Sequence, residues 1–411
     1  MSNNSFVPDE MQYTRPNQKV GGDTTWVSYR PTEAGPFVSD QSFSVNVSST
    51  SHFLQPDKTF LKYKVSLVGG SATAGTTSLS TMSLVAPLKD VSFSLGGVRV
   101  ESIRNYNQYI SIERKRTTAE RTNLLKELEA IGDPTCLSGS ADKLVKGRYC
   151  VHALENALGE MNDALPLPFI RGGVRLEIQL DSFNNVMAGN ANGHTNYRIE
   201  DVQLICGMIK PADAYMKEFQ GSLEAGRFAN IPIVATKSYQ TVLNASTAQT
   251  VDINCGFLQS LKSIMATQRV SSVFNSVASD LFNNDTHAGL KKWSVQVGSS
   301  KYPLNMDINV SNDVSVATPD PTGLALAVAA LSSHATGFDN KTARAENKDC
   351  FLYYNWSLDY NNGVSVSDGK VTLTLDYNTS PTAGNVLDVY AQCDALIQIG
   401  SGEIVLNERS L

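Results

Sequence analysis

The chain has few of the residues and motifs on which catalysis and metal binding depend. Its five histidines, His52, His152, His194, His287 and His334, are isolated, and no HExxH-type pair occurs. No GxSxG, P-loop or GxGxxG motif is present, so hydrolase and nucleotide-binding functions have no support. We therefore expect no catalytic, cofactor-binding or metal-binding residues, and we expect each histidine to be a surface or packed side chain.

The cysteines also lack the spacing of a metal site or of a disulfide framework. They contain no CxxC pair, and most are flanked by strand-like sequence. We predict buried free thiols. The six are Cys136, Cys150, Cys206, Cys255, Cys350 and Cys393.

Charge and long apolar runs are scarce as well. Charged residues make up 18% of the 411 residues, and the net charge of −6 argues against sequence-specific binding of nucleic acid. The strongest basic run, 114–116 (Arg-Lys-Arg), is interpreted as a solvated lead-in to a helix. No run approaches about 18 apolar residues, the length of a membrane-spanning helix. Residues 1–5 have neither the basic nor the apolar part of a secretory signal.

What the sequence does contain is the same order of elements twice. Residues 92–100 read as a strand, a glycine turn and a second strand, and residues 294–303 repeat the pattern. Each pair is followed by a helix candidate and later by a returning strand, at 173–181 and at 369–376. A repeat of this size indicates a duplicated β domain, whose role is shape and assembly.

Period-two alternation between glycine turns predicts short strands along most of the chain. The predicted fold is all-β, with two tandem eight-stranded jelly-roll β-sandwiches and short helices inserted between strands. A capping box at Thr117 to Glu120 predicts a helix over 117–131. Ala- and Leu-rich sequence predicts its counterpart over 322–335.

Prolines and glycines suggest the domain boundaries. Pro211 is suited to begin a short linker helix, and Gly221 and Gly226 are suited to end it. The predicted segments are an N-terminal arm at 1–36, a first jelly roll at 37–210, the linker helix at 211–226, a second jelly roll at 227–401 and a C-terminal tail at 402–411.

Two stretches carry a resemblance to a known family. The segment 60–65 (Phe-Leu-Lys-Tyr-Lys-Val), after Gln-Pro-Asp at 55–57, resembles an early strand of the double jelly-roll major capsid proteins. Residues 295–303 (Val-Gln-Val-Gly-Ser-Ser-Lys-Tyr-Pro) resemble a strand and turn in their second jelly roll. These proteins belong to the tectivirus, adenovirus and virophage lineage of icosahedral DNA viruses. As an order of elements, the resemblance covers most of the chain.

The resemblance implies a viral structural protein and not an enzyme. Such proteins form homotrimers, and six jelly rolls then make a pseudo-hexameric capsomer that tiles an icosahedral shell. The implied partners are further copies of the chain, neighbouring capsomers, penton and minor or cement capsid proteins and, through the termini, an internal membrane. The N-terminal arm and residues 403–411 would make such contacts. The implied location is the virion, after synthesis in the host cytoplasm or nucleus.

The residues leave a binding protein open as an alternative. A two-sandwich carbohydrate- or receptor-binding protein, such as a spike or penton-like protein, needs an exposed aromatic cluster or a calcium loop. Trp26, Trp293 and Trp356 form such a cluster only if they are exposed together, and we expect Trp293 and Trp356 in the core. The acidic positions at 283–285 and Asp320 are interpreted as solvated loops.

A glycoside hydrolase on a β-sandwich is the third class of function. It needs two facing carboxylates about 5–10 Å apart. Carboxylates such as Glu177 are interpreted as ordinary outward-facing strand positions.

Overall fold

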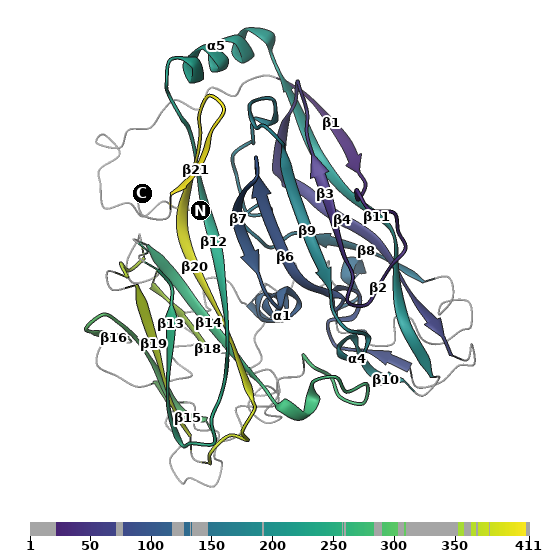
Figure 1. Cartoon of the computed structure of the whole chain (residues 1–411), viewed down its shortest axis with the longest axis vertical. Helices are drawn as coiled ribbons and strands as arrows, with labels where there is room; N and C mark the ends of the chain where they lie inside the picture. The colour runs from purple at the N-terminus through teal and green to yellow at the C-terminus, as the bar shows by residue number, and fades with distance from the viewer. Residues whose placement is uncertain are drawn as a thin grey trace.

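The computed structural model describes most of the chain as β-strand (Figure 1), which confirms the all-β prediction. Among the described residues, no helix is long and apolar enough to cross a membrane. The described residues are 22–70, 77–116, 127–131, 133, 147–190, 193–256, 258, 260–282, 290–302, 308–309, 352–356, 363–366, 369–377 and 379–407.

The first half of the chain forms a sandwich of two four-stranded layers. Its strands are β1 (Gly22–Tyr29), β3 (Ser42–Val47), β4 (Phe53–Gly69), β6 (Leu88–Leu95), β7 (Val98–Ile103), β8 (Arg148–Ala153), β9 (Val174–Leu180) and β11 (His194–Pro211). One layer has the order β1-β11-β4-β8 and the other β3-β9-β6-β7. Buried and more exposed residues alternate along β9, as expected for a strand with one face in the core. The short strands at the margin are β2 (Phe37–Val38), β5 (Thr77–Leu79) and β10 (Met187–Asn190).

The second half repeats this arrangement. Its strands are β12 (Ala229–Val242), β13 (Ala248–Asn254), β14 (Leu261–Arg269), β15 (Leu290–Val297), β16 (Ser300–Tyr302), β18 (Leu352–Asn355), β19 (Lys370–Tyr377) and β20 (Val386–Ile399). Their layers have the orders β12-β20-β14-β18 and β13-β19-β15-β16. Two further short strands, β17 (Ile308–Asn309) and β21 (Ile404–Asn407), pair with β15 and β20.

The two halves correspond strand by strand. Across the sheets, β1, β11, β4 and β8 take the places of β12, β20, β14 and β18, and β3, β9, β6 and β7 take those of β13, β19, β15 and β16. The hairpin predicted around Gly96 and Gly97 is β6–β7, and the one at Gly298 is β15–β16. The returning strands β9 and β19 pair with the first strand of each hairpin. The predicted repeat is therefore confirmed as two jelly rolls with the same topology.

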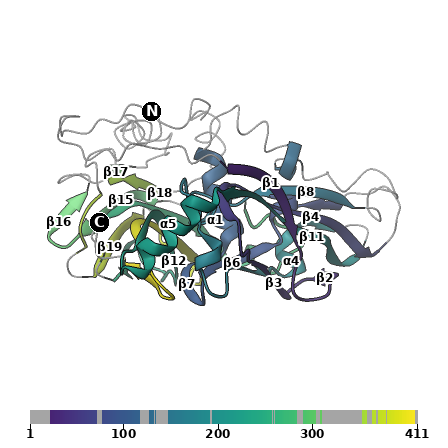
Figure 2. The ribbon, with the colours of Figure 1, turned by 90° about the horizontal axis from the view of Figure 1, so that it is seen from above.

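The two sandwiches lie side by side and share one sheet (Figure 2). Strand β7 of the first runs parallel to β12 of the second, with Ser102 opposite Lys237. This pairing joins one layer of each sandwich into a continuous nine-stranded sheet.

A helix that the sequence analysis did not predict precedes the first predicted helix. Helix α1 (Tyr106–Arg116) begins eleven residues before the expected 117–131. Of that range the structure describes 127–131, of which 127–129 are helical, and the predicted helix at 322–335 lies outside the described residues. Tyr106, Tyr109 and Ile110 on α1 are buried and share one helical face. The prediction started the helix at the capping box at Thr117 and therefore omitted this earlier helix.

The linker helix is α5 (Asp213–Glu224), at one end of the molecule in Figure 1. Gly221 lies inside it and does not end it, contrary to expectation. Gly226 follows the helix with φ of 81°, a backbone conformation that suits glycine. Phe219 of α5 packs against Phe53 and Phe169, which fixes the helix on the first sandwich. The short elements α4 (Phe183–Val186) and three 3₁₀ turns (Ser83–Val85, Leu167–Phe169 and Ser271–Val273) complete the helical content that is described.

Both terminal predictions need correction. Residues 22–29, expected in an N-terminal arm, form β1, which pairs with β11 along its whole length. Residues 404–407, expected in a polar tail, form β21 against β20. In each case an edge strand has few buried side chains, so it lacks the alternation by which strands are recognised. Residues 1–21 and 408–411 lie outside the described part of the chain.

Candidate functional site

A buried carboxylate lies where the two sandwiches meet. Glu101 of β7 accepts a hydrogen bond from the backbone N–H of Thr236 on β12 (2.6 Å) and another from Ala157 (2.7 Å). Burial raises the pKa of Glu101 to about 7, although both N–H donors act in the opposite direction. The side chain thus ties a strand of the second sandwich to two segments of the first.

The start of α1 makes the second contact across this junction. Asn105 donates from its amide nitrogen to Asp388 Oδ1 on β20 (3.0 Å). Its backbone oxygen accepts from the hydroxyl of Tyr390 (2.9 Å), and Gln392 donates to the hydroxyl of Tyr109 (3.1 Å). The three β20 side chains are spaced two residues apart, so they project from one face of the strand onto the α1 region. We call the contacts of Glu101, Asn105 and Tyr109 with the second sandwich the seam.

A buried ionic network holds α1 in the first sandwich. Arg114, with a side chain 4% exposed, donates two hydrogen bonds to Glu129 (2.9 and 3.0 Å) and also contacts Glu155. His152 Nδ1 lies 2.7 Å from Glu129, and its Nε2 lies 2.9 Å from the hydroxyl of Tyr106. That hydroxyl also accepts a hydrogen bond from the backbone N–H of Glu155 (2.9 Å).

Charge partners also set the ionisation of this network. Burial alone would raise the pKa of Glu129, but His152 and Arg114 outweigh burial and hold that pKa below its ordinary value. The carboxylate therefore stays charged inside the core. A paired and hydrogen-bonded charge of this kind fixes the position of the helix that carries its partner.

The interpretation of 114–116 as a solvated run was wrong for Arg114. Its partners follow it in the sequence by 15 and 41 residues, a separation at which no local pattern indicates contact. The spacing of Tyr106, Tyr109 and Ile110 could have indicated this burial, because it predicts a helix that begins before Arg114 and packs one apolar face in the core.

The other singled-out side chains lie mainly where the sequence suggested. His152 and His194 are buried and packed, whereas 287 and 334 lie outside the described residues, as do 283–285 and Asp320. Cys150, Cys206, Cys255 and Cys393 are buried free thiols, and burial raises the pKa of Cys206 to about 12 and that of Cys255 to about 11. Cys136 and Cys350 are not among the described residues.

The three tryptophans do not form an exposed cluster. Trp293 and Trp356 are 5% and 0% exposed, as predicted, and only Trp26 of the three is exposed, at 59%. Trp356 packs against Tyr302 and Tyr354 in an aromatic cluster of the second sandwich. The aromatic platform required by the carbohydrate-binding alternative is therefore not formed by these residues.

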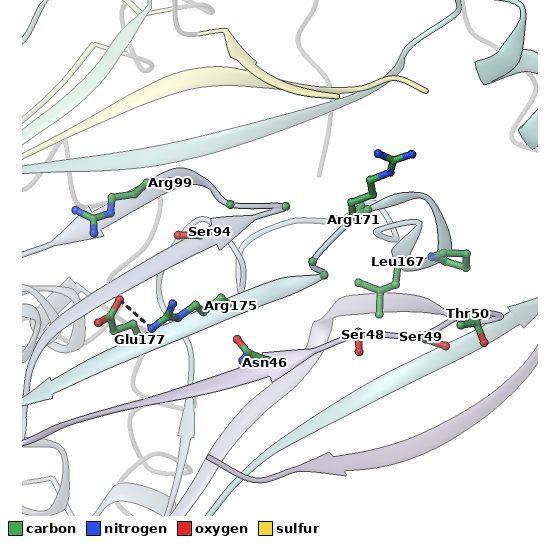
Figure 3. A pocket seen from close by; sticks show the side chains of 16 residues that line it. Asn46, Ser48, Ser49, Thr50, Ser94, Arg99, Leu167, Arg171, Arg175 and Glu177 are labelled. Atoms are coloured by element: carbon green, nitrogen blue, oxygen red, sulfur yellow. Dashed lines mark ion pairs between the residues drawn. The ribbon is translucent and has the colours of Figure 1, made fainter. Parts of the chain in front are cut away.

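An open groove lies on the outer face of the nine-stranded sheet, at the ends of β3, β6, β7 and β9 (Figure 3). It has a volume of about 1250 Å³ and is lined by Arg99, Arg171, Arg175 and Glu177 among other residues. Arg175 and Glu177 form a loose ion pair of 3.9 Å, and the Glu177 side chain is 44% exposed, as expected for an outward strand position. The groove is polar and open, and the described residues that line it include one carboxylate, that of Glu177, and neither a histidine nor a cysteine.

Comparison of the sequence with protein-family models and with curated proteins finds no match. The fold, in contrast, matches solved structures along nearly the whole chain. VP54 of PBCV-1, fitted into a reconstruction of the virophage Sputnik, is 12% identical with a TM-score of 0.63, covering 96% of this chain and 98% of VP54.

Two further structures agree. The Faustovirus major capsid protein is 8% identical with a TM-score of 0.60, covering 97% of this chain and 93% of its own. A chain of the Sputnik virophage is 10% identical with a TM-score of 0.59, covering 99% and 93%. At these identities the likeness concerns the fold, and the chain has the double jelly-roll fold of viral major capsid proteins.

Proposed function

We propose that this chain is a major capsid protein whose homotrimers form pseudo-hexameric capsomers of an icosahedral shell. The observation that carries the proposal is the duplication, because one chain holds two jelly rolls of the same strand order joined through a single sheet. Three such chains around an axis present six similar units, a shape that packs hexagonally. The solved structures with this fold include capsid proteins, and the proposal follows that likeness.

The seam supports this role. A building block that tiles a surface needs a fixed angle between its two sandwiches. Glu101, Asn105 and Asp388 join the sandwiches through one buried and one partly buried hydrogen bond, which hold one arrangement more strictly than apolar contact alone. The proposal divides the chain at α5, with the first jelly roll before it and the second after it.

The proposed partners are other copies of the chain, neighbouring capsomers, and penton and minor or cement proteins. Residues 1–21 precede β1 and are proposed to contact neighbouring subunits or an internal membrane. The proposed location is the virion. A structural role is proposed over an enzymatic one because solved structures with this fold are capsid proteins.

The first experiment is light scattering on the purified protein under native conditions. A mass near three times 44.5 kDa supports the capsomer proposal, and electron microscopy of the same sample then tests for hexagonal particles. A stable monomer at every concentration tested would reject it and would favour the binding-protein alternative, for which glycan screening is the next step.

A further inference from the structure

The open groove of the first sandwich carries a row of side chains whose order is set by strand pairing. Arg99 of β7 lies opposite Ser94 of β6, and Ser94 lies opposite Arg175 of β9 on its other side. Figure 3 shows the two arginines on either side of Ser94. Because neighbouring strands are about 4.8 Å apart, the two arginine backbones are about 10 Å apart with one small hydroxyl side chain between them. Both arginines are exposed.

The groove is positively charged, although the chain as a whole is acidic. Its charged lining residues are three arginines, Arg99, Arg171 and Arg175, and one acid, Glu177, which leaves a net charge of +2. The whole chain carries −6. Glu177 lies 3.9 Å from Arg175, and an exposed pair at this distance is weak. Neither Arg99 nor Arg171 forms an ion pair with a described residue.

The same row of the second sandwich has different side chains. Its hairpin β15–β16 and its strand β19 pair in the same register as β6, β7 and β9 in the first sandwich. The positions that correspond to Arg99, Ser94, Arg175 and Asn46 are Lys301, Gln296, Thr372 and Asp252. Asp252 accepts a hydrogen bond from Thr372 (2.9 Å) and pairs with Lys370 (2.8 Å). A jelly roll of this register therefore forms without two arginines in the row, so the strand pairing does not require them.

We propose that Arg99 and Arg175 bind a phosphate monoester, with the phosphate group above Ser94. Guanidinium groups form paired hydrogen bonds with phosphate oxygens, and a doubly charged tetrahedral anion has enough oxygens for two arginines and a hydroxyl at once. A carboxylate has one charge and two oxygens, which a single arginine can satisfy. The two arginines on either side of a hydroxyl therefore fit phosphate better than an acidic side chain.

The groove also has space for the organic group that carries the phosphate. Its volume of about 1250 Å³ exceeds the range of about 300–1,000 Å³ that is usual for small-molecule sites. Two glycine pairs, Gly96–Gly97 and Gly172–Gly173, border it, and a side chain added at Gly97 would meet no atom within 4 Å. The serine and threonine hydroxyls at 48–50 line the groove as well and are suited to a polar ligand. The site is independent of the proposed assembly.

The direct test is isothermal titration calorimetry of the full chain with inorganic phosphate and with glycerol 3-phosphate. We expect one site per chain. Arg99→Met and Arg175→Met should each weaken binding about tenfold or more, as expected for the loss of charge-assisted hydrogen bonds. Lys301→Met is the matched control, because it removes the cation at the corresponding position of the second sandwich. It should leave the affinity unchanged.

A second variant should strengthen binding. Glu177→Gln removes the carboxylate that competes with the phosphate for Arg175, so the affinity should rise about 2–5-fold. A gain of affinity cannot result from partial unfolding. This variant therefore tests the site even if an arginine substitution disturbs the fold.

The source of the phosphate is tested with vesicles. Phosphatidic acid carries a phosphate monoester, so co-flotation with phosphatidylcholine vesicles that contain it is compared with vesicles of phosphatidylcholine alone. Arginine-dependent binding of the soluble esters indicates a soluble ligand, and arginine-dependent binding to these vesicles alone indicates a lipid headgroup; both support the proposal. It would be overturned if neither bound, if Arg99→Met and Arg175→Met bound as tightly as the wild type, or if a hexaglutamate peptide bound as tightly as glycerol 3-phosphate. None of these outcomes bears on the proposed capsid role, which depends on the mass in solution.

Discussion

The two sandwiches have the same topology but different interiors. In the first, Arg114 on an inserted helix joins Glu129, Glu155 and His152 in a buried ionic network. In the second, Trp356 is fully buried among tyrosines. The strand order is therefore retained while the side chains that fill the space are exchanged. Backbone pairing and the alternation of buried residues specify a jelly roll, and many different cores satisfy them.

The difference also concerns what each interior does. The network of the first sandwich anchors α1, and the start of α1 reaches the second sandwich through Asn105 and Tyr109. The aromatic cluster of Trp356, Tyr302 and Tyr354 lies within the second sandwich. The ionic network of the first sandwich thus positions the residues of the seam. A change in this network is therefore expected to affect both sandwiches.

The largest expected effect comes from Arg114→Met. The substitution leaves Glu129 and Glu155 in the core without their cation, and loss of one partner of a buried ion pair costs about 3–5 kcal/mol. We expect a lower midpoint of thermal unfolding. Hydrogen exchange should rise in 106–116 and also in β20, because α1 contacts that strand.

Trp356→Phe is the matched change in the second sandwich. It keeps an aromatic ring in the cluster but leaves a small cavity, and Trp356 Nε1 has no hydrogen-bond partner among the described residues, so the substitution should cost about 1–2 kcal/mol. If this variant lowers the midpoint as much as Arg114→Met does, the contrast between an ionic and an aromatic interior does not hold.

An effect of intermediate size is expected at the seam, where stability should depend on pH. The pKa of Glu101 is about 7 in the folded chain, above the ordinary 4.5, so the folded state favours the protonated side chain. This contribution is fully present below pH 4.5 and is lost as the pH rises through 7. Its size is about 3 kcal/mol over that window. We expect the thermal midpoint of the wild type to fall between pH 5 and pH 8.

Glu101→Gln provides the control, because glutamine stays neutral across this range. The difference between the two midpoint curves isolates the titration of Glu101 from that of all other groups. A difference that stays constant from pH 5 to pH 8 would show that Glu101 does not titrate there. Hydrogen exchange around Thr236 would locate the change at the seam, since its N–H is bonded to this carboxylate.

The sequence predicted the parts of this fold that depend on local pattern. Strands such as β9, with one face in the core, carry alternation that is visible without a structure. The edge strands β1 and β21 do not, because little of their surface is buried. The seam and the ionic network were not predictable, since they join residues far apart in sequence. Glu101 and Thr236, for example, meet only after both sandwiches have formed.

The smallest effect is expected at the surface, where the two sandwiches also differ. Lys370 of β19 pairs with Asp252 of β13 at 2.8 Å, and both side chains are half exposed. In the corresponding strands of the first sandwich, Arg175 of β9 lies opposite Asn46 of β3 and has no acid across from it. Solvent and salt screen exposed pairs strongly, so Lys370→Met should leave the thermal midpoint nearly unchanged at physiological salt. A large loss of stability, persisting in high salt, would contradict this. An unchanged midpoint would mean that this surface ion pair contributes little to stability, so the two sandwiches can differ at such positions without cost.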